Sequence, residues 1–162
     1  VGWYQGRSEW GSRALGNRSI LANPAHKNMK DIINSKIKKR ESFRPFAPSV
    51  LNDDVPKFFE CDIRSEFMNH IVKFKKEWCK VFPSVCHVDD TARLQTVNKD
   101  NNPLFYQLIS ELKKITGYGI ILNTSFNENE PIVDTPEQAI SCFLRTDMDI
   151  LFLEKFMICK DS

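Results

Sequence analysis

A capped helix that leads directly into a short apolar strand is the feature that most limits how this chain can fold. In residues 102–117, Asn102 is placed to cap a helix, Pro103 suits its first turn and Gly117 suits its end. Apolar residues recur between these caps at helical spacing, namely Leu104, Leu108, Ile109, Leu112 and Ile115. Residues 118–126, YGIILNTSF, predict a strand that ends in polar residues. The alternation of helix and strand indicates an α/β domain.

The same alternation continues on both sides. Thr135, Pro136 and Gln138 predict a capping box at the start of a helix over 135–146, and 149–160 reads as two strands about a tight turn. Residues 21–41 predict another helix, with Asn23 as its cap and Pro24 in its first turn. This helix ends near a basic run comprising Lys36, Lys38, Lys39, Arg40 and Arg44. The run is either a solvated helix end or part of an anion-binding surface.

The middle of the chain is less regular. Pro45 and Pro48 force an extended path over 43–51, which we expect to fix the direction of Arg44. Residues 66–78 fit either a strand or a helix, and we favour the strand, whereas 87–97 indicates a turn that runs into a strand. With no internal repeat or linker, the expected architecture is a single α/β domain with a mixed sheet and a C-terminal hairpin.

Composition narrows the functional classes. The net charge of +2 over 162 residues is too small to indicate nucleic-acid binding by itself, and no apolar run approaches the length of a membrane span. The first residue is Val1 rather than Met, so we expect a part of a longer protein. The five cysteines have no C-x-x-C spacing and are odd in number, which argues against a zinc knuckle or a disulfide framework and suits a reducing cytoplasm.

An anion site is indicated near the start of the chain. Residues 4–20, YQGRSEWGSRALGNRSI, contain three glycines and three arginines, a combination that permits close backbone approach and offers fork-shaped donors. Residues 6–13 nearly match the phosphate-binding G-x-x-x-x-G-K-[ST] loop, but the lysine is missing and no apolar strand is expected before it. A standard nucleoside-triphosphatase loop is therefore rejected. Either Arg13 points at a bound anion, or the segment is a structural turn whose arginines face water.

Two further groups of polar residues could join this site. Asn123, Thr124 and Ser125 follow the apolar part of a predicted strand, where ligands gather in α/β sheets. Arg93 follows a turn in which Asp89 and Asp90 either hold Mg²⁺ or shape the backbone, and we favour the turn role for at least one of them. These groups include no acid–base pair and no nucleophile. They suit charge neutralisation of phosphoryl groups.

Four stretches resemble, in order, the C-terminal domain of the NodU/CmcH-type carbamoyltransferases over residues 6–160: GRSEWGSRALGNRSIL, KKRESFRPFAPSVL, HVDDTARLQTV and LNTSFNENEPIVDTPEQAI. The resemblance implies a YrdC-like domain over 1–162, with a twisted mixed sheet flanked by helices. It also implies an N-terminal transferase lobe of the same protein that is absent from this chain.

The resemblance implies an enzyme. The domain would bind ATP, with Mg²⁺, and carbamoyl phosphate, and form carbamoyl adenylate, from which the other lobe would carbamoylate a hydroxyl acceptor. The implied catalytic residues are Lys38, Arg44 and Arg93, and the implied substrate- and nucleotide-binding residues are these three with Arg13, Asn123 and Ser125.

The resemblance also bears on metals and partners. Iron would belong to the missing lobe, so no metal ligand is expected here, and His26, His70 and His87 are not assigned as ligands. We expect a cytoplasmic protein with no membrane partner and no nucleic acid. Two alternatives stay open: a non-catalytic nucleotide- or RNA-binding YrdC-like module, and a purely structural lobe.

Overall fold

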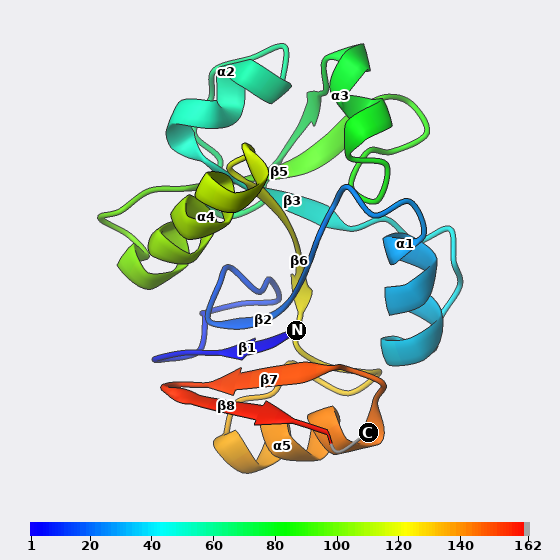
Figure 1. Ribbon diagram of the computed structural model, residues 1–162, viewed down its shortest axis with the longest axis vertical. Helices are drawn as coiled ribbons and strands as arrows, with labels where there is room; N and C mark the ends of the chain where they lie inside the picture. Colours follow the sequence, from blue (N-terminus) through cyan, green and yellow to red (C-terminus); the bar gives the residue numbers. More distant parts are fainter. Residues whose placement is uncertain (161–162) are drawn as a thin grey trace. The chain divides into compact units, whose positions relative to one another are not determined.

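The computed structural model describes residues 1–160, and within this range eight strands form a mixed sheet flanked by helices (Figure 1). The strand order is β4-β5-β3-β6-β2-β1-β7-β8, so the α/β class and the mixed sheet expected from the sequence are confirmed. The chain divides into two compact units. The first comprises residues 1–22, 30–44 and those from 123 onward, and the second comprises 23–29 and 45–122. Among the described residues, no helix is long and apolar enough to cross a membrane.

The first unit is built on a sheet formed by the two ends of the chain. Its elements are β1 (Gly2–Tyr4), β2 (Arg18–Ala22), the π-helical turn η1 (Ile33–Ile37), α5 (Pro136–Arg145), β7 (Ile150–Leu153) and β8 (Phe156–Cys159). β1 runs antiparallel to β2 and parallel to β7, and β7 forms the predicted antiparallel hairpin with β8. Gly2 makes room for close packing in β1, because a Cβ there would lie 3.0 Å from side-chain atoms of both Phe126 and Leu151.

Helix α5 covers this part of the sheet. The predicted capping box is confirmed: the Thr135 hydroxyl accepts from the Gln138 amide, and the Gln138 side chain accepts from the Thr135 amide. The helix buries Ala139, Cys142 and Phe143 and packs against β1 and β7. One face of α5 is therefore core, and its other face reaches solvent.

The second unit carries the remaining strands and the longest helix described. Its elements are β3 (Ala47–Leu51), the 3₁₀ turn η2 (Asn52–Asp54), α2 (Val55–Phe58), β4 (His70–Lys73), α3 (Lys76–Val81), β5 (Thr91–Val97) and α4 (Pro103–Thr116). β5 lies parallel to β3 and antiparallel to β4. Strand β6 (Ile120–Ser125) begins in this unit and ends in the first.

Helix α4 has the predicted caps but a different buried face. The Asn102 side chain accepts from the Phe105 amide at 3.0 Å, and Gly117 ends the helix with a φ of +81°. Phe105 and Ile109 are buried, whereas Leu104 and Ile115 from the predicted stripe are exposed. The stripe was wrong at its two ends because spacing alone does not say which side of an amphipathic helix meets the sheet.

The helix predicted over 21–41 is shorter and irregular. The Asn23 side chain accepts from the Ala25 amide at 2.9 Å and closes a turn, so α1 (Met29–Ile32) begins only at Met29. The chain then continues directly into η1. In 66–78 the favoured strand is confirmed by β4, which spans residues 70–73. The last three residues of this range begin helix α3.

One cysteine pair differs from the expectation of reduced thiols. Cys79 of α3 and Cys86 form a disulfide, with a Cα–Cα distance of 5.4 Å. The turn between them brings the two residues together, which their sequence spacing does not reveal. Cys61, Cys142 and Cys159 are free.

Candidate functional site

A cavity of about 540 Å³ with both polar and apolar lining lies in the first unit between two loops that are far apart in the sequence. One wall is the glycine-rich loop, defined here as residues 5–17, and the other is the end of β6 with the loop that follows it. The lining residues are Ser8, Glu9, Gly11, Ser12, Ser125, Asn127, Pro131, Ile132, Val133 and Asp134. The structure thus brings together two of the three segments that the sequence singled out.

The glycine-rich loop is held open by contacts at its base. Gly6, Gly11 and Gly16 all have positive φ angles, of +52°, +112° and +111°, which glycine adopts without strain. The Glu9 carboxylate accepts from the backbone amides of Leu15 at 2.6 Å and Asn17 at 2.8 Å. Contrary to the sequence-based expectation, a short strand, β1, precedes this loop.

Arg13 in this loop and Arg18 directly after it have different roles. Arg18 is buried, its guanidinium lies 3.5 Å from the centre of the Tyr4 ring, and it donates to the carbonyl oxygens of Gln5 and Gly6, both at 2.9 Å. Arg18 therefore holds the loop in place. Arg13 is exposed and does not line the cavity.

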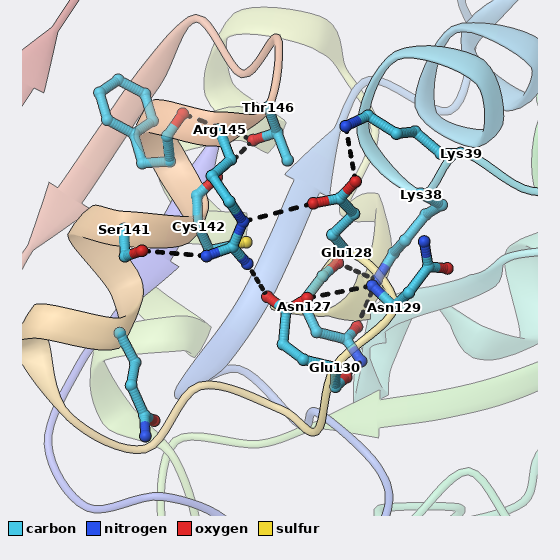
Figure 2. Close-up of polar contacts among 12 residues, drawn as sticks. Lys38, Lys39, Asn127, Glu128, Asn129, Glu130, Ser141, Cys142, Arg145 and Thr146 are labelled. Atoms are coloured by element: carbon cyan, nitrogen blue, oxygen red, sulfur yellow. Dashed lines mark hydrogen bonds and ion pairs between the residues drawn. The ribbon is translucent and has the colours of Figure 1, made fainter.

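Lys38 is the charged group beneath the opposite wall. Its side chain is fully buried, and its ammonium donates to the carbonyl oxygens of Ser125 at 2.5 Å and Asn127 at 2.8 Å. It also reaches the Asn127 side-chain oxygen at 2.6 Å (Figure 2). The Ser125 hydroxyl lies 3.3 Å from the same ammonium. Because these four oxygens are uncharged, the ammonium adds positive potential directly behind two residues that line the cavity.

Burial makes the charge on Lys38 sensitive to pH. Desolvation by burial, with further repulsion from Arg40, lowers the pKa of Lys38 to about 7, against smaller opposing effects of Cys142 and Glu130. An anion placed near the ammonium would stabilise its charged form and raise this pKa. The site can therefore couple anion binding to proton uptake.

An unusual backbone puts Lys38 in this position. It follows the π-helical turn η1, and the next residue, Lys39, has a φ of +43°, in the left-handed region. Buried Asn34 within η1 donates to the carbonyl oxygen of Arg44 at 3.1 Å and accepts from Arg40 at 2.7 Å, which ties the following turn back to η1. Short π-helical segments often occur at functional sites.

The other predicted residues lie in different surroundings. Asn123 is buried and donates to the carbonyl oxygen of Ala14 at 3.2 Å, so it links β6 to the glycine-rich loop. Arg44 is exposed, and Arg93 is half-buried on β5 of the second unit, opposite Ile71. Asp89 has the favoured turn role, since its carboxylate accepts from the hydroxyl of Thr91 at 2.7 Å.

Three charged residues near the site were missed by the sequence analysis. Glu128 and Glu130, in the loop after β6, form ion pairs with Arg145 of α5, and Glu128 also pairs with Lys39 at 2.7 Å (Figure 2). Asn127 was missed as well, although it follows Ser125 by two residues. Isolated charges and amides in a loop carry no spacing signal, so only their partners identify them.

The residues present fit a phosphorylated nucleotide with Mg²⁺. The cavity volume lies within the usual range of roughly 300–1,000 Å³ for small-molecule sites. Ser8, Ser12, Ser125 and Asn127 bring hydroxyl and amide groups to the lining, and Asp134 brings a carboxylate. Mg²⁺ is commonly held by one or two carboxylates together with substrate phosphates.

Another possible metal-ligand group occurs in the second unit. In the described part of the chain, the Cys79, Cys86 and Asp90 ligand atoms lie within 4.8 Å of one another. The two sulfurs are bonded to each other, so this group is a disulfide beside a carboxylate.

Comparison with known proteins places the chain in a family. Residues 1–160 match the family described as "Carbamoyltransferase C-terminus". Nodulation protein NolO of Bradyrhizobium diazoefficiens is 50% identical over 99% of the chain, and nodulation protein NolNO of Sinorhizobium fredii is 51% identical over 99%. Nodulation protein U of Rhizobium tropici is 41% identical over 75%. The match spans only 30%, 24% and 21% of these relatives, respectively.

Proposed function

Because the chain belongs to the carbamoyltransferase C-terminal family, we propose that it is the half of a carbamoyltransferase that binds ATP and carbamoyl phosphate and forms carbamoyl adenylate. The observation that carries the proposal is the ammonium of Lys38 held against Ser125 and Asn127 behind the wall of the cavity. The reaction concentrates several negative charges in one place. A fixed positive charge there lowers their mutual repulsion in the ground state and in the transition state.

The proposed reaction has two steps. Water first cleaves carbamoyl phosphate to carbamate and phosphate. A carbamate oxygen then attacks the α-phosphorus of ATP, and the bond to pyrophosphate breaks, so that carbamoyl adenylate forms. No side chain has to act as a nucleophile in the second step, and charge stabilisation with alignment supplies most of the rate enhancement.

Each wall of the cavity has a part in this proposal. Lys38 stabilises charge on the phosphoryl or carbamoyl oxygens, while Ser125 and Asn127 form the part of the cavity wall that lies against its ammonium. The glycine-rich loop lets backbone amides approach the phosphates without a clash with a side chain. Asp134 provides a carboxylate for the Mg²⁺ that accompanies ATP. Arg13, Arg44 and Arg93 stay proposed as anion contacts.

A second lobe completes the proposed enzyme. The chain spans about 30% of the length of NolO, so most of a protein of that size would lie outside it. We propose that an N-terminal lobe accepts the carbamoyl adenylate and transfers the carbamoyl group to a hydroxyl acceptor. Removal of the acceptor proton requires a base or a metal, and this step is assigned to the proposed N-terminal lobe.

Carbamoyl-phosphate-dependent exchange of labelled pyrophosphate into ATP tests this function. Exchange is expected from the 162-residue chain supplied with Mg²⁺, and Lys38→Met is expected to lower its rate by roughly 100-fold or more. Lys114→Met is the matched control, because it removes a lysine whose partner is Glu111 in an exposed pair of the second unit. Folded wild-type chain that binds nucleotide without any exchange would support a nucleotide-binding module instead. Equal rates for wild type and Lys38→Met would remove Lys38 from the site.

A further inference from the structure

The loop that presents Ser125 and Asn127 to the cavity is folded around the ammonium of Lys38. The Ser125 hydroxyl donates to the Asn127 side-chain oxygen at 2.7 Å, and the Asn127 amide group donates to the carbonyl oxygen of Glu130 at 2.6 Å. Residues 125–130, called here the 125–130 segment, therefore act as one hydrogen-bonded unit. The position of Glu130 therefore bears on that of Asn127, because the Asn127 side chain is hydrogen-bonded to the Glu130 backbone carbonyl.

A second set of contacts holds the same segment from outside the cavity. The Arg145 guanidinium pairs with Glu130 through one terminal nitrogen and with Glu128 through Nε at 3.4 Å. Its other terminal nitrogen donates to the Ser141 hydroxyl at 2.9 Å, one turn earlier in α5. In Figure 2, Arg145 lies between α5 and the two glutamates. The guanidinium thus uses all three nitrogens to join a rigid helix to a loop.

The opposite side of Glu128 is bound by Lys39. Their ion pair is 2.7 Å long, and the positive φ of Lys39 lets consecutive lysines reach the same segment, Lys38 from within and Lys39 from outside. A left-handed conformation costs a non-glycine residue about 1–2 kcal/mol. The left-handed conformation of Lys39 allows both lysines to contact the 125–130 segment.

We propose that Arg145 is a positioning residue for the cavity wall, acting through Glu128 and Glu130 on Ser125 and Asn127. The inference rests on the proposed function only for the identity of the ligand. Arg145 does not line the 540 Å³ cavity, but lines a neighbouring cavity of about 520 Å³ that shares residues 131–134 with it. Its effect passes through Glu130 to Asn127, and from Asn127 to the oxygens that surround Lys38.

The charge arrangement distinguishes positioning from general stabilisation. The side chains of Arg145 and Lys39 are 44% and 53% exposed, whereas Glu128 is 13% exposed. Pairs of this exposure contribute little to global stability, typically below about 1 kcal/mol. The same pairs can still set the geometry of a loop. A shift of about 1 Å in a ligand-contacting group lowers affinity or rate far more than it lowers the free energy of unfolding.

Amide hydrogen exchange in the ligand-free 162-residue chain tests the positioning directly. Arg145→Met is expected to speed exchange by about tenfold at the amides of Asn127, Asn129 and Val133, whose acceptors lie within this loop region. Arg145→Lys keeps the charge but loses the fork, and it is expected to restore exchange only in part. Lys114→Met, from an exposed ion pair of similar length in the second unit, is expected to leave these amides unchanged.

Binding of carbamoyl phosphate supplies the second readout. Calorimetric titration is expected to show about tenfold weaker binding for Arg145→Met, with a melting temperature close to that of Lys114→Met. Glu130→Gln is expected to weaken binding to a similar extent, and the double variant to be no weaker than either single variant. Additive losses of binding free energy in the double variant would show that Arg145 does not act through Glu130.

The two proposals fail in different ways. A wild-type chain that does not bind carbamoyl phosphate, but whose loop amides exchange faster in Arg145→Met, would overturn the proposed ligand and support the positioning role. Unchanged loop exchange together with unchanged affinity in Arg145→Met would overturn the positioning role and leave the proposed function standing.

Discussion

The ammonium of Lys38 lies 2.6 Å from the side-chain oxygen of Asn127, although the two residues are 89 positions apart in the sequence. This contact places a buried positive charge directly behind the cavity. Burial of the ammonium also lowers the pKa of Lys38, and both properties can be measured.

The stability of the chain should depend on pH through Lys38. Burial lowers the pKa of Lys38 from 10.5 to about 7 in the folded state. Between these values the unfolded chain binds the additional proton, so the Lys38 contribution makes the free energy of unfolding rise with pH. The rise is expected to approach about 1.4 kcal/mol per pH unit within this window and to vanish below pH 7. Urea unfolding of wild type and Lys38→Met between pH 6 and 10 measures it. Curves with the same pH dependence would contradict a low pKa at Lys38.

Binding of carbamoyl phosphate near pH 8 should be accompanied by proton uptake. Lys38 is largely neutral at that pH, because its pKa is about 7, and a bound anion favours its charged form. Calorimetry in buffers of different ionisation enthalpy should therefore show uptake of up to about one proton. The same titration at pH 6 is the internal control, since Lys38 is already protonated there. Equal uptake at both pH values would assign the proton to another group.

Replacement of Arg18 by Met should lower the free energy of unfolding much more than the same replacement of Arg13. Arg18→Met removes a buried guanidinium that serves the carbonyl oxygens of Gln5 and Gly6, and is expected to lower the free energy of unfolding by about 3 kcal/mol. Arg13→Met removes an exposed guanidinium and is expected to change it by less than about 0.5 kcal/mol. Denaturant unfolding compares the two variants. A large loss for Arg13→Met would reveal a structural role that its exposure does not suggest.

The Cys79–Cys86 disulfide should stabilise the second unit modestly. The two residues are separated by 7 positions, and closing so short a loop restricts the unfolded chain by about 2 kcal/mol. Cys86→Ser should therefore unfold at lower denaturant concentration than oxidised wild type, by about that free energy. Reduced wild type should resemble the variant. Cys159→Ser, at an exposed free cysteine, should match wild type under both conditions.

The local features of the chain were predictable because short-range interactions determine them. Asn102 and Gly117 define the ends of α4, and Thr135 with Gln138 begins α5, through contacts within a few residues. The alternation of such helices with apolar segments was enough to predict a mixed α/β sheet. The polar end of β6 could be assigned to a candidate site for the same reason.

Which residues of the same type are buried or paired depends on the tertiary structure. Arg13 and Arg18 share one glycine-rich segment, but only Arg18 becomes buried, because Tyr4 and the carbonyl oxygens of Gln5 and Gly6 surround it. Cys79 pairs with Cys86 because a turn returns the chain to α3.

The sequence by itself determined the helix caps, the α/β class and the segments that carry the polar residues, since these depend on neighbours along the chain. The position of Lys38 required the whole first unit. A π-helical turn and a left-handed Lys39 aim two lysines at a loop some 90 residues away, where Arg145 holds the paired glutamates. Long-range partners of this kind are selected by packing and by the cost of burying unpaired polar groups, and neither leaves a periodic signal in the sequence.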